Sequence, residues 1–390
     1  MWRIVKENPE TQATIAKAGG AETLVLLLRD ATRRPATPQA KAYALWSLSL
    51  CIDASNYEQV VDAGGVRPLV LTLGGKDITA KEQAACALSK LAVHHDDARA
   101  EIARAGGVEP LIALLDGTEA GGSDASQQHA AAALAELAHI AGVKDAIGRA
   151  GGIAPLVSLL WSNPDAPPSA VVSKRHAAAA LARLSTESGS EEQLKSGKGS
   201  TGAAAAVEAA RAAKTPEEVW GDGDDDESTR SMPAGRSHFR RRPTLLPSRP
   251  TPALALQIAD AGAIAPLVKL LTSAVNAIGR GETSAEAQAE AAGALWALAD
   301  HASNRLSITE SGGIGPLVSL LGCDNSHARM HAEGALVRLS IETSNRVLII
   351  KQLVSMLTND GSTCAAAKSA LAHPATRPFL DRQKQFHFMK

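Results

Sequence analysis

The sequence predicts an all-α solenoid built from stacked three-helix repeats, and three observations support this fold class. Strings similar to AGGVEPLIALLDG (105–117) begin at residues 18, 63, 105, 150, 261 and 311. Their spacings of 45, 42, 45, 111 and 50 residues are typical of stacked supersecondary units. The chain is 45% hydrophobic but only 3% aromatic, which favours thin layers of Ala, Leu, Val and Ile over a wide globular core.

The first element of each repeat is a short amphipathic helix, such as YEQVVDAGG (57–65) or ARAEIARAGG (98–107). A glycine pair follows it in most copies. Because glycine has no Cβ, Gly106 and Gly107 can both adopt positive φ. We therefore expect the pair to cap this helix and to turn the chain sharply.

The second element is a helix that begins just after the glycine pair. Five copies carry a proline three residues past the second position of the pair, and the first copy carries Thr23 there: the prolines are Pro68, Pro110, Pro155, Pro266 and Pro316. Proline suits the first turn of a helix, where its missing N–H costs nothing. The LVxLL pattern that follows predicts an apolar stripe facing the core.

The third element is a longer helix with the kernel Ala-Leu-x-x-Leu. The kernel occurs at 44–48, 87–91, 133–137, 180–184, 294–298 and 335–339. Two copies are preceded by the capping-box pattern, Thr79 with Glu82 and Thr283 with Glu286, which predicts where these helices begin. The small alanines allow neighbouring third helices to approach closely.

This reiterated pattern resembles the armadillo repeat of catenins, importin-α and the fungal and plant armadillo proteins. The resemblance covers roughly residues 1–186 and 254–372. It implies a superhelix whose third helices line a concave groove that holds an extended peptide. Importin-like grooves carry a Trp and an Asn four residues apart on successive third helices, and this chain has no such ladder. That difference counts against an import adaptor that reads basic signals.

The predicted domain order is an N-terminal repeat block (1–186), an insertion (187–253), a C-terminal repeat block (254–372) and a tail (373–390). Charge blocks alternate with Gly, Ser and Pro in the insertion, which predicts disorder. The first residues resemble the end of a third helix, so the chain is expected to start inside a repeat. IIKQLVSMLTNDG (349–361) has lost the glycine pair and the proline, so the last unit is expected to be degenerate.

The sequence offers no catalytic, cofactor or metal site. The GxSxG, HExxH, P-loop and strand-linked GxGxxG patterns are absent, so we expect no enzyme activity. Asp222, Asp224 and Asp226 imitate the start of a calcium loop, but Glu227 and Pro233 occupy two essential positions. His327 and His331 could lie on one helix face, yet no further ligand is evident.

Composition narrows the class of partner. A net charge of -1 and a pI near 6.8 give no general attraction to nucleic acid or to anionic membranes. No stretch approaches 18 apolar residues, and no secretory signal is visible. The four cysteines, Cys51, Cys86, Cys323 and Cys364, are expected to be reduced thiols in a cytoplasmic or nuclear protein. The resemblance to armadillo proteins implies a protein partner, and the oligomeric state stays open.

The candidate binding residues lie on the third helices. Lys90, Arg183 and Arg338 share one kernel position and form a mostly basic ladder, with Arg175 on the helix of Arg183 and Glu136 as an interruption. The first repeat contributes Tyr43 and Ser47. Trp46 and Trp296 lie beside the ladder, either as binding anchors or in packing between repeats. The ladder predicts an extended, acidic or phosphorylated peptide as the ligand.

Several alternatives remain open at this level. The chain resembles the substrate-recruiting part of a plant U-box ubiquitin ligase, although it has no U-box pattern. It also resembles fungal vacuolar armadillo scaffolds, although Met1 is followed by Trp2 and not by the glycine that acylation requires. The acidic run 222–227 of the insertion could fold onto the basic ladder, or the insertion could be a passive loop. Arg240–Arg242 could be an import signal, a kinase site or solubilising charge.

Overall fold

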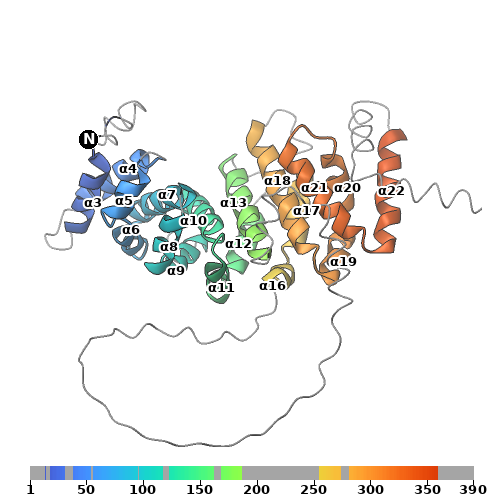
Figure 1. Ribbon diagram of the computed structural model, residues 1–390, viewed down its shortest axis with the longest axis horizontal. Helices are drawn as coiled ribbons and strands as arrows, with labels where there is room; N and C mark the ends of the chain where they lie inside the picture. The colour runs from blue at the N-terminus through green and yellow to red at the C-terminus, as the bar shows by residue number, and fades with distance from the viewer. Residues whose placement is uncertain are drawn as a thin grey trace, which may run out of the picture. The chain divides into compact units, whose positions relative to one another are not determined.

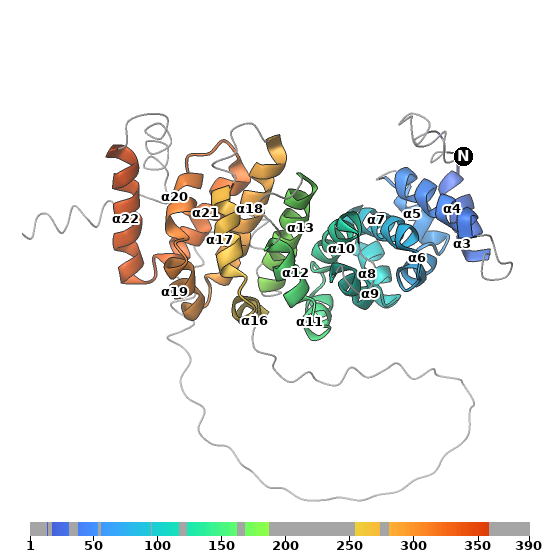
Figure 2. The same ribbon diagram turned by 180° about the vertical axis from the view of Figure 1, so that it is seen from behind.

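The computed structural model describes residues 14, 18–30, 38–53, 56–94, 96–116, 123–161, 168–186, 254–273 and 281–358. Their secondary structure is helical, and these residues contain no strand. The helices follow one another in the order of the repeats (Figures 1 and 2). The first helices are α5 (Tyr57–Asp62), α8 (Asp96–Arg104), α11 (Ala141–Arg149), α16 (Leu254–Asp260) and α19 (Ala302–Glu310). The second helices are α3 (Gly20–Asp30), α6 (Val66–Leu73), α9 (Val108–Leu115), α12 (Ile153–Leu160), α17 (Ile264–Ser273) and α20 (Ile314–Leu320).

The third helices are the longest of each repeat and pack against one another in chain order. They are α4 (Pro38–Cys51), α7 (Ile78–His94), α10 (Asp124–Leu137), α13 (Pro168–Ser185), α18 (Gly281–Leu298) and α21 (Ser326–Leu339). We call these six helices the third-helix layer. The first alanine of each kernel is almost completely buried, from 4% exposed at Ala44 to 0% in the other five helices. Burial of each kernel leucine on folding contributes roughly 1.5 to 3 kcal/mol to the stability of the stack.

The glycine pair makes the predicted turn, but its two members have different roles. Gly106 has φ +77°, and the N–H of Gly107 donates to the carbonyl of Ile102 at 3.0 Å, as in a Schellman cap. Gly107 itself has φ −71° and precedes α9, so positive φ occurs only at the first glycine. A Cβ on Gly107 would lie 2.8 Å from Cγ2 of Ile102 and 3.3 Å from Cγ2 of Val70. The second glycine is therefore small because Ile102 of its own repeat and Val70 of the preceding repeat pack against it.

Both predicted capping boxes are wrong. α7 begins at Ile78, and the Asp77 carboxylate accepts hydrogen bonds from the N–H groups of Thr79 at 3.0 Å and Ala80 at 3.2 Å. Asp77 is thus the capping residue. Its carboxylate satisfies donors that have no partner inside the helix. Thr283 lies inside α18, which already begins at Gly281, so it cannot cap that helix.

The fourth and fifth repeats pack as neighbours although 67 residues, 187–253, separate them in the sequence. α13 contacts both α16 and α18, and α13, α18 and α21 lie side by side in Figures 1 and 2. A Cβ on Gly148 of α11 would lie 2.5 Å from Cδ2 of Leu254 in α16. The repeats on both sides form one compact unit. The insertion lies outside the described residues, and its predicted disorder and the predicted domain boundaries stay predictions.

The last described element confirms a degenerate unit. α22 (Thr343–Thr358) is one continuous helix of 16 residues, where the other repeats have two helices joined at a glycine turn. The loss of the glycine pair removes the residue with positive φ that would end the first helix. The predicted start of the chain inside a repeat lies outside the described residues.

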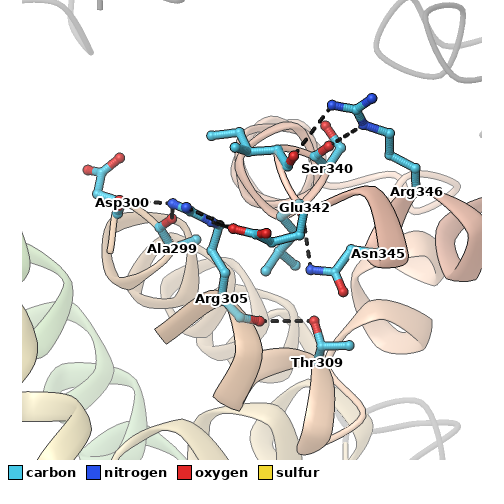
Figure 3. A network of polar contacts seen from close by, with 10 residues as sticks. Ala299, Asp300, Arg305, Thr309, Ser340, Glu342, Asn345 and Arg346 are labelled. Atoms are coloured by element: carbon cyan, nitrogen blue, oxygen red, sulfur yellow. Dashed lines mark hydrogen bonds and ion pairs between the residues drawn. The ribbon is translucent and has the colours of Figure 1, made fainter. Parts of the chain in front are cut away.

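Polar side chains join the end of one third helix to the repeats that follow (Figure 3). The guanidinium of Arg305, which is 8% exposed, donates to the carbonyls of Ala299 at 3.3 Å and Asp300 at 3.0 Å. It also forms an ion pair with Glu342 at 3.0 Å. Asn304, Asn345 and Arg346 likewise donate to carbonyls at the ends of α18 and α21. Those carbonyls have no partner inside their own helices, so the contacts replace lost hydrogen bonds.

No single helix among the described residues is long and apolar enough to cross a bilayer. Only α16 and the first part of α17, taken together across a bend of 76°, have the length and composition of a span.

Candidate third-helix binding surface

The predicted ladder occupies one position of each kernel, the residue directly before the last leucine. Ser47 on α4 is 2% exposed and Ala297 on α18 is 5% exposed, so neither offers a side chain to a ligand. Lys90, Glu136, Arg183 and Arg338 are half-buried at the same position of α7, α10, α13 and α21. The structure therefore presents a charged ladder that begins in the second repeat and skips the fifth.

Lys90 reaches back to the preceding repeat. Its Nζ donates to the carbonyl of Ser49, at the end of α4, with a separation of 2.5 Å. No carboxylate in the described part of the chain forms an ion pair with this ammonium group. Burial raises the pKa of the Cys86 thiol, the positive charge of Lys90 lowers it, and the carboxylate of Glu82 raises it. Among the described residues, Lys90 thus carries a cationic charge that is not held in an ion pair.

The cations of the fourth repeat are compensated by carboxylates of its neighbours. Arg183 forms an ion pair with Glu136 of α10, with 3.2 Å between nitrogen and oxygen. Arg175 forms an ion pair with Glu286 of α18. Glu136, which the sequence identified as an interruption of the ladder, therefore neutralises its next member. The sequence indicated Glu286 only as part of a capping box. In the structure its carboxylate contributes negative charge to the third-helix layer.

Trp296 and Arg338 pack together between α18 and α21. The Arg338 guanidinium lies 5.3 Å from the centre of the indole ring, donates to the Trp296 carbonyl at 3.2 Å and forms an ion pair with Asp300. A Cβ on Gly334 would lie 2.4 Å from the indole. The ring therefore needs a glycine beneath it, and Trp296 packs between repeats.

The other two predicted aromatic residues belong to the first described third helix. Tyr43 is 50% exposed and Trp46 is half-buried, both on α4. Three third helices, α7, α10 and α13, separate α4 from α18 in the stacking order. The structure consequently does not bring Trp46 and Trp296 into one site.

Three histidines, His129, His176 and His331, share the position four residues before the kernel. Burial lowers the pKa of His129. Burial and the neighbouring positive charge of Arg175 lower the pKa of His176 to about 4. Nδ1 of His331 lies 2.7 Å from the carbonyl of Ala289, so this nitrogen carries the proton that is donated. These side chains are therefore polar packing elements between third helices at neutral pH.

The described residues contain no group of three His, Cys, Asp or Glu side chains that could hold a metal ion. The rings of His327 and His331 lie 6.3 Å apart between centres. Cys51, Cys86 and Cys323 are free thiols. Cys364 and the acidic run 222–227 lie outside the described residues.

Comparison with known proteins agrees with this architecture. The model of the Armadillo/beta-catenin-like repeat matches residues 53–93. An engineered protein of known crystal structure is 28% identical, with a TM-score of 0.59 over 94% of this chain and 71% of that chain. A designed armadillo repeat protein in complex with the peptide (KR)4 is 21% identical, with a TM-score of 0.51 over 82% of this chain and 98% of that chain. No curated protein matches the sequence.

The repeated turn, the stacked kernels and the surface along the third helices define an α-solenoid of three-helix repeats. The match at residues 53–93 and the solved structures add that this solenoid has the armadillo-repeat fold.

Proposed function

We propose that this protein is a non-enzymatic scaffold that binds an extended segment of a partner protein along its third-helix layer, and that the bound segment is acidic or phosphorylated. One observation carries the proposal: half-buried charged side chains recur at one kernel position of four third helices. A repeated position presents its side chains at regular intervals, as an extended chain does. The designed armadillo protein that holds (KR)4 supports a peptide as the type of ligand.

We expect Lys90 to contribute most of the preference of the third-helix layer for acidic peptides. Arg183 and Arg338 already form ion pairs with Glu136 and Asp300, so an acidic ligand would have to compete with those carboxylates. Lys90 instead donates a hydrogen bond to the carbonyl of Ser49. A carboxylate or phosphate placed beside Lys90 would form a charge-assisted hydrogen bond, which contributes about 1.5 to 3 kcal/mol before ordering costs.

Peptide binding can be measured by fluorescence anisotropy with three labelled probes: (Glu-Ser)6, its neutral analogue (Gln-Ser)6, and (KR)4. We expect (Glu-Ser)6 to bind most tightly. Lys90→Glu should weaken that binding at least about tenfold, which corresponds to about 1.4 kcal/mol. Lys76→Glu is the matched control, because Lys76 is exposed in the loop before α7 and lies off the third-helix layer.

Circular dichroism should first confirm that the variants are equally helical. Tighter binding of (KR)4 than of (Glu-Ser)6 would contradict the acidic preference and leave peptide binding intact. Equal losses for Lys90→Glu and Lys76→Glu would remove Lys90 from the site. Failure of all three probes would contradict the proposal that the layer binds extended peptides of this kind. Nothing in the described residues favours the ubiquitin-ligase or membrane-tether alternatives.

A further inference from the structure

The carboxyl ends of two second helices, α9 and α12, border an open pocket of about 370 Å³. These helices pack against each other in successive repeats. Asp116 directly follows α9 and Trp161 directly follows α12, so the two residues occupy the same position of their repeats. The pocket is lined by Leu115, Asp116, Gln127, Ser158, Leu159 and Trp161, and it contains none of the ladder residues of the third-helix layer.

Asp116 places a carboxylate where the helix dipole disfavours negative charge. The last carbonyls of a helix carry a partial negative charge, which a nearby cation would stabilise. Neither α9 nor α12 has a basic residue in its last turn, and no described cation forms an ion pair with Asp116. The positive end of α10, which reaches the pocket through Gln127, already has a carboxylate of its own, Asp124. Within the described residues, the negative charge of the pocket is therefore uncompensated.

Trp161 adds an aromatic surface to this negative pocket. The side chain is 56% exposed, although burial of an indole is favourable. Its ring has no ring contact or hydrogen bond with the described residues. The face of a tryptophan attracts cations more strongly than that of any other aromatic side chain. The carboxylate, the helix ends and the indole thus all favour the same kind of ligand, an organic cation.

We propose that this pocket binds the guanidinium group of an arginine side chain from a partner protein. A guanidinium stacks on an indole and donates two parallel hydrogen bonds to a carboxylate, so one group satisfies both Trp161 and Asp116. A lysine ammonium is a compact, strongly hydrated charge and lacks the planar face that stacks. The site takes a ligand of the opposite charge to that expected at Lys90, so it is a second site, independent of the third-helix layer.

Fluorine NMR of the full chain labelled with 5-fluorotryptophan tests this proposal. The chain has five tryptophans, and Trp161→Phe identifies the signal of Trp161. The probe is the blocked peptide acetyl-Gly-Arg-Gly-amide, and its lysine and citrulline counterparts serve for comparison. We expect the arginine probe to shift the Trp161 signal to saturation, with a Kd at least about fivefold lower than that of the lysine probe. Citrulline, which resembles arginine in shape but has no charge, should leave the signal unchanged.

Asp116→Asn should weaken binding of the arginine probe at least about fivefold, because it removes the charge and keeps the shape of the side chain. Asp62→Asn is the matched control, since Asp62 is an exposed carboxylate at the end of another helix, α5, and lies outside the pocket. Asp62→Asn and Lys90→Glu should both bind the probe as tightly as the unaltered chain does.

Three results would overturn the proposal. The first is a Trp161 signal that does not respond to about 10 mM arginine probe, and the second is equally tight binding of the lysine or citrulline probe. The third is a loss of affinity in Asp116→Asn no larger than that in Asp62→Asn. A loss in Lys90→Glu would instead place the probe on the third-helix layer, and the pocket would not be the site.

Discussion

At the scale of single residues, His176 makes the free energy of unfolding depend on pH. Its imidazole is held uncharged by burial and by Arg175, which lower its pKa from about 6.5 to about 4. Below pH 6.5 the unfolded chain takes up a proton that the folded chain does not bind. The contribution of the uncharged His176 imidazole to the free energy of unfolding is therefore complete above pH 6.5. It is lost as the pH falls toward 4.

Urea unfolding at pH 7.5 and pH 5 measures this loss. We expect the unaltered protein to lose about 2 kcal/mol from this one group, with other titrating groups adding their own terms. His176→Gln should reduce the difference, because a glutamine, Gln83, occupies the same position of α7. His327→Gln, at an exposed histidine of α21, should not reduce it. Identical pH dependence in the unaltered protein and His176→Gln would contradict the assignment.

At the scale of helices, Arg305 holds the end of α18 against α19 and, through Glu342, against the start of α22 (Figure 3). Arg305→Met keeps much of the apolar stem but leaves two carbonyls and a carboxylate without their donor. The expected loss of stability is about 2 to 3 kcal/mol. Arg104→Met is the control, since Arg104 is a surface residue in an exposed ion pair with Glu101. This substitution should change stability by less than about 0.5 kcal/mol.

A repeat array need not unfold in one step, so hydrogen exchange is the suitable measurement. It gives the loss of stability in Arg305→Met and also shows which helices lose protection. Loss of protection should begin at α19 and α22. A change of stability for Arg305→Met no larger than that for Arg104→Met would show that the guanidinium contacts contribute little.

The helices were predictable from the sequence because their signals are local. The glycine turn, the proline in the first turn and the kernel each lie within a few residues, and the structure confirms them. The capping box at Thr79 failed because Asp77, one residue before the helix, accepts the first N–H groups in its place. The ion pairs that neutralise the arginines of the ladder were not predictable. Arg183 pairs with Glu136, 47 residues earlier in the sequence, and Arg175 pairs with Glu286, 111 residues later. Only the register between neighbouring repeats brings such pairs together.

At the scale of the whole molecule, the insertion interrupts the sequence but not the stack. Replacing residues 187–253 by a flexible linker of about 20 residues should change stability by only about 1 kcal/mol, because the cost of closing a loop grows slowly with its length. Thermal unfolding and exchange at α16 and α18 measure this. Loss of protection in those helices would mean that the insertion helps to hold the fifth repeat.

The same variant tests the hypothesis that the acidic run 222–227 covers the basic ladder. Tighter binding of (Glu-Ser)6 after the replacement would support that hypothesis. Unchanged affinity would make the insertion a passive loop.

The ion pairs between neighbouring third helices have a consequence for the order of the repeats. Arg183 is neutralised only because α10, with Glu136, precedes α13, and Arg175 only because α18, with Glu286, follows it. If the third repeat were deleted, Arg183 would come next to Lys90 and two like charges would meet. The six copies share one backbone plan, yet they are not interchangeable modules. The fourth copy carries charges that match the third copy before it and the fifth copy after it, so exchanging or duplicating these repeats would bring unmatched charges together.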